Sequence, residues 1–220
     1  MRTVVFDLDG TLADTSQDLL AAANACFIQL GLGLPLDQTD SLTAFQGGRA
    51  MLLLGSVRLG LDWDEDRVAQ EYPRLLAAYA AGIDTHTRLY PGAVAALTTL
   101  RAQGYALAIC TNKPQDLAET LTARLGIREM FGALIGADTL PHRKPDPAPY
   151  HEAVQRVGGS LARSFLLGDT ETDVKTARAA GVPVALVAFG PEGPGVARLR
   201  PDAILTRFDD LPTLAADLLP

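Results

Sequence analysis

Short apolar runs alternate with helical patterns along most of this chain, and this alternation limits its possible folds more strongly than any other feature. The runs are rich in β-branched and other large apolar residues, as is typical of strands buried on both faces. Alternating strands and helices predict an α/β fold, a doubly wound parallel sheet covered by helices on both faces. The predicted strands are residues 4–6, 105–110, 133–135, 165–167, 184–188 and 203–205, and the predicted helices are residues 93–102, 115–125, 149–157 and 172–180.

One connection is much longer than the others. Residues 15–88 separate the first predicted strand from the next strand and helix, whereas a strand-to-helix loop usually has roughly 2–6 residues. Apolar residues recur at helical spacing over residues 19–30 and 68–79, which predicts a helical domain within the insertion. Pro73 is expected to break or kink the second of these helices. We therefore predict an α/β core domain of residues 1–14 and 89–220, with a helical domain of residues 15–88 inserted into it.

Composition narrows the class of function. The formal net charge of −7 argues against a general surface for nucleic acid or anionic membranes, so a small ligand is expected. No apolar run approaches the length of a membrane span, and the first predicted strand begins too close to Met1 to leave room for a signal peptide. The two cysteines, Cys26 and Cys110, lie in apolar stretches and predict buried thiols in a reducing compartment. We expect a cytoplasmic protein that is a monomer or a homodimer.

Polar residues gather directly after the predicted strands. Asp7 and Asp9 follow the first strand in "FDLDGT", and side chains two residues apart on a strand point the same way, so their charges repel. The later strands lead into "TNKP", into the segment that ends at Lys144, and into "GDTETD". Because ligands bind beyond the carboxyl ends of strands in an open parallel sheet, these groups are expected to converge. Hydroxyl, amide, ammonium and carboxylate groups at one edge predict a phosphate site that also holds a cation.

The cation follows from the number of acidic groups. Four carboxylates, those of Asp7, Asp9, Asp169 and Asp173, cannot all remain ionised in one cleft unless a divalent ion offsets them. Oxygen ligands without histidine or thiolate favour Mg²⁺. Only three of the nineteen basic residues are lysines, yet Lys113 and Lys144 both lie in these edge loops, which makes chance placement a poor explanation.

Four motifs, "DLDGTLADT", "TNKP", "KPDP" and "GDTETD", occur in this order, and with them the chain resembles the haloacid dehalogenase (HAD) superfamily of phosphohydrolases. Further matches, "LYPG" and "GADTLPHRKPDPAP", make it similar to the phosphoglycolate phosphatase branch, which implies a Rossmann-like core and a helical cap. The resemblance implies Asp7 as nucleophile and Asp9 as general acid and base. It further implies Thr111, Asn112 and Lys144 as ligands of the phosphoryl group, and Asp7, Asp9, Asp169 and Asp173 as the Mg²⁺ site.

The turn "FQGGRA" in the insertion has two readings. Gly48 and its neighbours could simply turn the chain between two helices. A cap that closes over a site also needs a group that reads the leaving part of the substrate, and Arg49 suits a carboxylate or a second phosphate. Gly48 and Arg49 are therefore candidate substrate-binding residues.

The leading hypothesis is a Mg²⁺-dependent phosphatase of a small phosphorylated metabolite, acting through an aspartyl-phosphate on Asp7. The resemblance makes 2-phosphoglycolate the first candidate substrate. A sugar phosphomutase similar to β-phosphoglucomutase is the main alternative, since such enzymes resemble this chain in their core motifs and use a cap arginine. A haloacid dehalogenase is disfavoured by Asp9 and Gly10, which those relatives lack. A phospho-accepting signalling domain is disfavoured by the inserted cap and by Asp9, and a catalytically silent binding protein by the complete motif set. The loop "AFGPEGPG" departs from the branch pattern and leaves the named substrate open.

Overall fold

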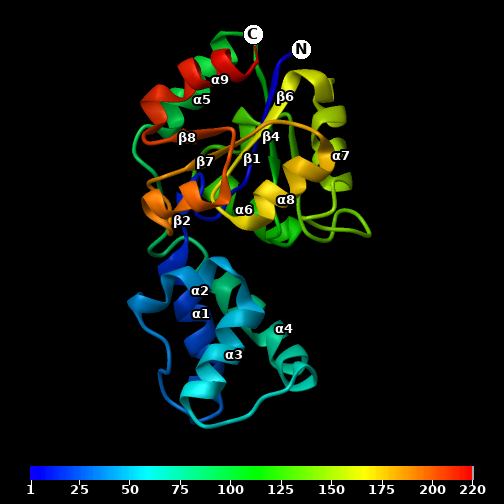
Figure 1. Ribbon diagram of the computed structural model, residues 1–220. Helices are drawn as coiled ribbons and strands as arrows, with labels where there is room; N and C mark the ends of the chain where they lie inside the picture. Colours follow the sequence, from blue (N-terminus) through cyan, green and yellow to red (C-terminus); the bar gives the residue numbers. More distant parts are fainter. Residues whose placement is uncertain (220) are drawn as a thin grey trace. The chain divides into compact units, whose positions relative to one another are not determined.

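The computed structural model describes residues 1–219 and divides the chain into two compact units (Figure 1). One unit comprises Met1–Asp14 together with the chain from Leu89 onward, and the other comprises Thr15–Arg88. The chain leaves the first unit after β2 (Ala13–Asp14) and returns at β3 (Arg88–Leu89), and these short strands form a two-stranded sheet. Among the described residues, no helix combines the length and the apolar composition that a membrane span requires.

The α/β unit contains a six-stranded sheet in the order β5-β4-β1-β6-β7-β8, in which every neighbouring pair is parallel. Its central strand, β1, is buried on both faces because its residues are apolar except for Thr3. The predicted α/β fold is confirmed. The strands are β1 (Thr3–Phe6), β4 (Ala106–Cys110), β5 (Ala133–Ile135), β6 (Ser164–Gly168), β7 (Val184–Val187) and β8 (Ala203–Leu205).

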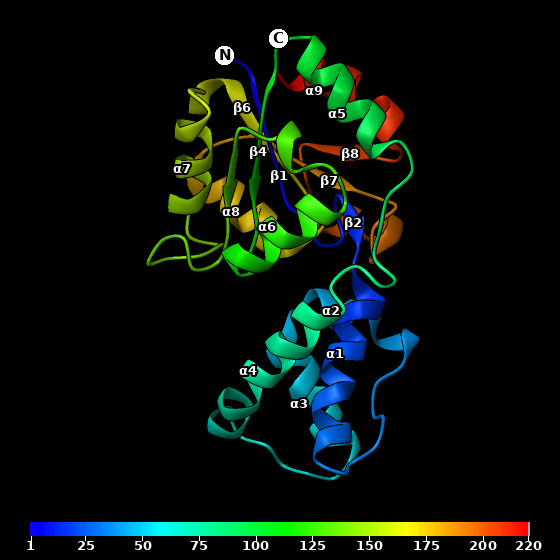
Figure 2. The same cartoon turned by 180° about the vertical axis from the view of Figure 1, so that it is seen from behind.

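Helices cover both faces of this sheet. Two views of the ribbon place α7 (Ala148–Arg156) and α8 (Glu171–Ala180) on one face (Figures 1 and 2). On the opposite face lie α5 (Ala93–Ala102), α6 (Gln115–Arg124) and α9 (Leu211–Leu218). Strand order reverses at β1, because the chain adds β4 and β5 on one side of it and β6, β7 and β8 on the other. Such a reversal opens a crevice at the carboxyl ends of the strands.

The second unit is mainly helical and contains α1 (Ser16–Gln29), α2 (Ser41–Phe45), α3 (Gly48–Arg58) and α4 (Glu65–Ala81), and its last residue begins β3. Pro73 lies within α4, which continues past it, so of the two expected effects, a break or a kink, the break does not occur. The proline is exposed, whereas Val68, Leu75 and Tyr79 are buried, and this packing holds the helix together across the missing backbone donor.

A buried carboxylate joins the two ends of the helical unit. Asp18, in the first turn of α1, accepts hydrogen bonds from the backbone N–H groups of His86 and Thr87 and from the Thr87 hydroxyl. The start and end of the insertion are therefore fastened to each other. This contact explains how 74 residues, Thr15–Arg88, can be inserted between β2 and the end of β3 without separating the strands around them.

Candidate active site

The strand ends β1, β4 and β6 form the edge at which the predicted site residues meet. In the parallel register Phe6 lies between Ile109 and Leu167, so the residues that follow these three positions emerge side by side. The pairing continues beyond the strand, because the N–H of Asp7 donates to the carbonyl of Leu167 at 2.9 Å. Asp7 is thus level with Cys110 and Gly168, and Thr111 and Asp169 follow one position further at the same edge of the sheet.

Three carboxylates cluster at this edge. One oxygen from each of Asp7, Asp169 and Asp173 lies within 4.8 Å of the other two. The ammonium nitrogen of Lys144 lies 3.0 Å from Asp7 Oδ2 and 2.6 Å from Asp173 Oδ1, and the lysine side chain is buried. Asp9, which the resemblance also places among the metal ligands, has its carboxylate outside this cluster.

Asp173 uses both carboxylate oxygens for contacts with the protein. Oδ1 accepts from Lys144, while Oδ2 accepts from the N–H groups of Asp169 and Thr170 and from the Thr170 hydroxyl, at 2.8–3.2 Å. Gly168 makes this arrangement possible, since a Cβ at that position would lie 2.3 Å from Asp173 Cγ. Asp173 was predicted as a metal ligand and belongs to the carboxylate cluster, and these contacts also suit it to holding the loop and Lys144 in place.

In Asp169, by contrast, only one of the two carboxylate oxygens is hydrogen-bonded to the described residues. Its Oδ1 accepts a hydrogen bond of 2.8 Å from the Thr11 hydroxyl, while Oδ2 is buried and has no hydrogen-bond partner among the described residues. A buried, unpartnered carboxylate oxygen is costly unless a cation neutralises it. Asp169 therefore fits a metal ligand on geometry as well as on sequence position.

Asp9 forms an ion pair with a second lysine of the site. The Lys113 ammonium lies 2.9 Å from Asp9 Oδ1, and only 3% of the lysine side chain is exposed. Sequence reasoning noted that Lys113 lies in an edge loop but gave it no role. The scarcity of lysine in the chain was the signal that could have promoted it.

The loop after β4 provides the polar groups predicted to bind phosphate. Thr111 Oγ1 accepts from the N–H of Lys113 at 3.2 Å, which leaves the hydroxyl hydrogen available for a ligand oxygen. Asn112 is an exposed residue, and its side-chain amide donates to the carbonyl oxygen of Lys144 at 3.0 Å. Asn112 thus joins the two lysine-bearing loops, a contact that sequence reasoning did not anticipate.

With this geometry established, the family can be assigned. Residues 4–187 match the family described as haloacid dehalogenase-like hydrolase. The chain belongs to the haloacid dehalogenase-like hydrolases. The predicted family and its hydrolase class are therefore confirmed.

The similar proteins extend over nearly the whole chain. A phosphoglycolate phosphatase of Cereibacter sphaeroides is 38% identical and aligns over 100% of both chains. One of Caulobacter vibrioides is 37% identical over 99% of this chain and 92% of its own length. The crystal structure of a predicted phosphoglycolate phosphatase from Haemophilus somnus is similar with a TM-score of 0.85 and 26% identity, and the match covers 97% of each chain.

The pKa values of two carboxyl groups in the site of this hydrolase are raised, as expected where positive charge is insufficient. Burial raises the pKa of Asp7 to about 6, although the nearby Lys144 ammonium opposes this shift. Burial, and then the charges of Asp173 and Asp7, raise the pKa of Asp169 well above its ordinary range. A bound cation would lower both pKa values, because an opposite charge favours the ionised form.

The loop that departs from the branch pattern packs against the start of the site. A Cβ at Gly190 would lie 2.7 Å from the carbonyl oxygen of Gly10, so only glycine allows this approach. Phe189 contacts the rings of Tyr90 and Phe208, with centroids 5.0 and 5.1 Å apart. The "AFGPEGPG" loop therefore has a fixed position beside the "DLDGTLADT" motif.

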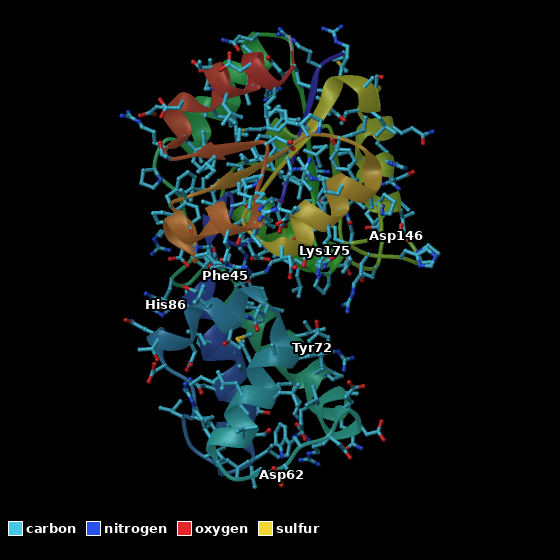
Figure 3. All side chains as sticks on the ribbon, in the orientation of Figure 1. Phe45, Asp62, Tyr72, His86, Asp146 and Lys175 are labelled. Carbon is cyan, nitrogen blue, oxygen red and sulfur yellow. The ribbon has the colours of Figure 1, made fainter. Side chains whose placement is uncertain are left out.

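Gly48 and Arg49 lie in the helical unit, at the start of α3. The Arg49 guanidinium is exposed and lies over the ring of Tyr72, 4.8 Å from its centroid; Figure 3 labels this tyrosine on α4. A Cβ at Gly48 would lie 2.9 Å from Tyr72 Cε2, so glycine allows the ring to pack here. These contacts orient Arg49, whose part in substrate binding stays a prediction.

Proposed function

We propose that this hydrolase is a Mg²⁺-dependent phosphomonoesterase with 2-phosphoglycolate as its first candidate substrate. The observation that supports this most directly is the edge of the sheet, where four carboxylates face two buried lysines. The excess of two negative charges matches one divalent cation. The named substrate is supported by the curated relatives that are phosphoglycolate phosphatases at 37–38% identity over almost the whole chain.

The metal would be held by Asp7 and Asp169, with Asp173 fixing the Asp169 loop and Lys144 from behind. The unpartnered oxygen of Asp169 and the oxygen-only donor set fit a hard cation such as Mg²⁺. When bound, Mg²⁺ supplies positive charge that reduces the repulsion between an anionic nucleophile and an anionic phosphate. We propose that Asp9 contributes through its proton chemistry, since its carboxylate lies outside the cluster of Asp7, Asp169 and Asp173.

The reaction proceeds in two displacements. A carboxylate oxygen of Asp7 forms a bond to phosphorus, the ester P–O bond breaks, and the leaving oxygen takes a proton from Asp9. Water then attacks the aspartyl-phosphate, Asp9 accepts its proton, and the bond between Asp7 and phosphorus breaks to release phosphate. With a pKa of about 6, Asp7 is mostly ionised at pH 7 and able to attack.

The remaining groups hold the phosphoryl group during these steps. The Lys144 ammonium remains charged because Asp173 and Asp7 raise its pKa against the effect of burial. Lys144 and the Thr111 hydroxyl can both donate to phosphoryl oxygens, and charge-assisted donors are the stronger kind. The helical unit is proposed as the cap, with Arg49 and the Gly48 turn reading the part of the substrate that leaves.

A screen of phosphate release across small phosphorylated metabolites tests the proposal. We expect release from 2-phosphoglycolate with Mg²⁺, none with excess chelator, and none from Asp7→Asn. Asp9→Asn incubated with an activated aryl phosphate is expected to retain one phosphoryl group on the peptide that contains Asp7, as read by mass spectrometry. Transfer of the phosphoryl group to a sugar phosphate, without net phosphate release, would instead indicate a phosphomutase.

A further inference from the structure

Lys113 is a buried lysine at the edge of the proposed active site, and no step of the proposed reaction involves it. Its ammonium lies 2.9 Å from Asp9 Oδ1, and its side chain is 3% exposed whereas that of Asp9 is 19% exposed. A lysine of this burial is uncommon unless a partner compensates its charge. The pair therefore joins a lysine enclosed by protein to an acid that reaches solvent.

The backbone around Lys113 is fixed on both sides. Its N–H donates to Thr111 Oγ1 at 3.2 Å, and its carbonyl accepts from the N–H of Ala137 at 2.9 Å. Pro114 follows and leads directly into α6, so the chain cannot easily move here. The ammonium is thus held from a rigid loop rather than from a flexible surface segment.

The backbone of Asp9 is held by an isolated parallel bridge with Ala13, so the proposed catalytic role also requires its side chain to be oriented. Asp9 follows the last residue of β1 by three positions and precedes Gly10, whose φ of 78° lies in the left-handed region. Proton transfer requires the acid to lie within about 2.6–3.2 Å of the leaving oxygen, so a carboxylate free to rotate would be a poor catalyst. The ion pair with Lys113 limits this rotation.

Two of the three lysines of the chain differ from the third in burial and in their ion-pair partners. Lys144 pairs with Asp7 and Asp173, and Lys113 pairs with Asp9, so Asp7 and Asp9 each have a separate buried lysine. Lys175, labelled on α8 in Figure 3, forms a surface pair with Glu171 and is 59% exposed. Lys175 therefore offers a matched control at which a charge is removed outside the site.

We propose that Lys113 is a positioning residue for Asp9 that makes proton donation to the leaving group efficient. Lys113 donates to Asp9 Oδ1 and so directs the transferable proton to Oδ2, the other oxygen of the carboxyl group. The inference rests on the proposed function, because it assumes that Asp9 protonates the leaving oxygen. It predicts that replacing Lys113 lowers kcat/KM more for substrates whose leaving oxygen is more basic.

The test compares two substrates in one preparation of each variant. An alkyl phosphate, 2-phosphoglycolate or the best alkyl substrate of the screen, needs a proton on its leaving oxygen, whereas 4-nitrophenyl phosphate releases a stable phenolate. For Lys113→Met we expect kcat/KM to fall about 100-fold on the alkyl phosphate, the lower range for loss of general acid catalysis, and by much less on the aryl phosphate. The ratio of the two kcat/KM values does not depend on the fraction of protein that is folded.

Two further variants complete the test. Lys113→Arg keeps the charge and is expected to restore part of the ratio, and Lys175→Gln is expected to leave it unchanged. Equal losses on both substrates, complete loss on both included, or no loss on either, would overturn the role of Lys113. If the parent enzyme released phosphate from neither substrate, the proposed function itself would fail, and this outcome is distinct from the others.

Discussion

Asp169 and Asp173 are four residues apart in the same carboxylate cluster, yet their replacement by asparagine is expected to change stability in opposite directions. The reason lies in what each carboxylate contacts. Both oxygens of Asp173 accept hydrogen bonds, one from the Lys144 ammonium and the other from three donors. In Asp169, by contrast, Oδ2 is buried without a partner among the described residues.

For Asp173→Asn the structure predicts a large loss. An asparagine side chain has one donor end, which must face either the Lys144 ammonium or the N–H groups of residues 169 and 170, so a donor meets a donor in both orientations. The substitution also removes the carboxylate that lies 2.6 Å from buried Lys144. Breaking a buried ion pair by removing one partner costs about 3–5 kcal/mol. For a chain of this length that corresponds to a fall in Tm of roughly 6–20 °C.

For Asp169→Asn we expect the metal-free protein to be as stable as the parent or more stable. The substitution removes a charge whose pKa burial and the neighbouring acids raise, while the amide oxygen can still accept from Thr11. If the parent binds Mg²⁺ as proposed, Mg²⁺ should raise its Tm, since binding to the folded state alone stabilises it by mass action, and the same variant should lose this increase.

Calorimetry with excess chelator, and then with Mg²⁺, measures these changes. Circular dichroism is a suitable second probe, whereas tryptophan fluorescence is not, because the single tryptophan, Trp63, lies in the helical unit. An Asp173→Asn variant that unfolds at the parent's Tm would refute the positioning role of Asp173. An Asp169→Asn variant that loses as much stability as Asp173→Asn would refute the assignment of Asp169 as the ligand with a free oxygen.

Three other predictions follow from the same structure. Because burial raises the pKa of Asp7 to about 6, the folded metal-free protein binds more protons than the unfolded chain between about pH 4 and 6. Its free energy of unfolding, measured in urea with chelator, should therefore fall as the pH rises through this range, and a slope of the opposite sign would contradict the burial effect. Arg49→Ala should lower kcat/KM on carboxylated substrates more than on 4-nitrophenyl phosphate, and equal losses on both would remove its proposed recognition role. Gly168→Ala should reduce both Tm and activity because its Cβ would lie 2.3 Å from Asp173 Cγ, whereas Gly195→Ala, with no atom within 4 Å of the added Cβ, should behave like the parent.

The strands and the edge of the sheet could be predicted because they depend on local chemistry. An apolar run that must be buried on both faces identifies β1, β4 and β6, and their parallel order brings the residues that follow them to one edge. Asp7, Thr111 and Asp169 meet there for that reason alone. No side-chain geometry is needed to predict their convergence.

The pairings within the site could not be predicted in the same way. Asp9 with Lys113, and Asp169 with Thr11, depend on rotamers of side chains from separate loops, for which sequence spacing gives no rule. The occupied oxygens of Asp173 likewise depend on the tight turn at Gly168. Pro73 failed as a helix breaker for a related reason, since tertiary packing of α4 outweighs a local backbone preference.

The distribution of charge at the sheet edge explains why the two lysines are placed as they are. Four carboxylates with no fixed cation nearby would strongly destabilise the metal-free fold. Four carboxylates with four lysines would leave no net negative charge to attract a metal ion. Lys144 and Lys113 neutralise the edge only in part, and each does so from a buried position that also orients an acid. The remaining negative charge centres on Asp7 and Asp169, the carboxyl groups whose pKa values are raised. The proposed metal affinity and the proposed positioning of the acids therefore have a common origin, and a substitution of either lysine should change both.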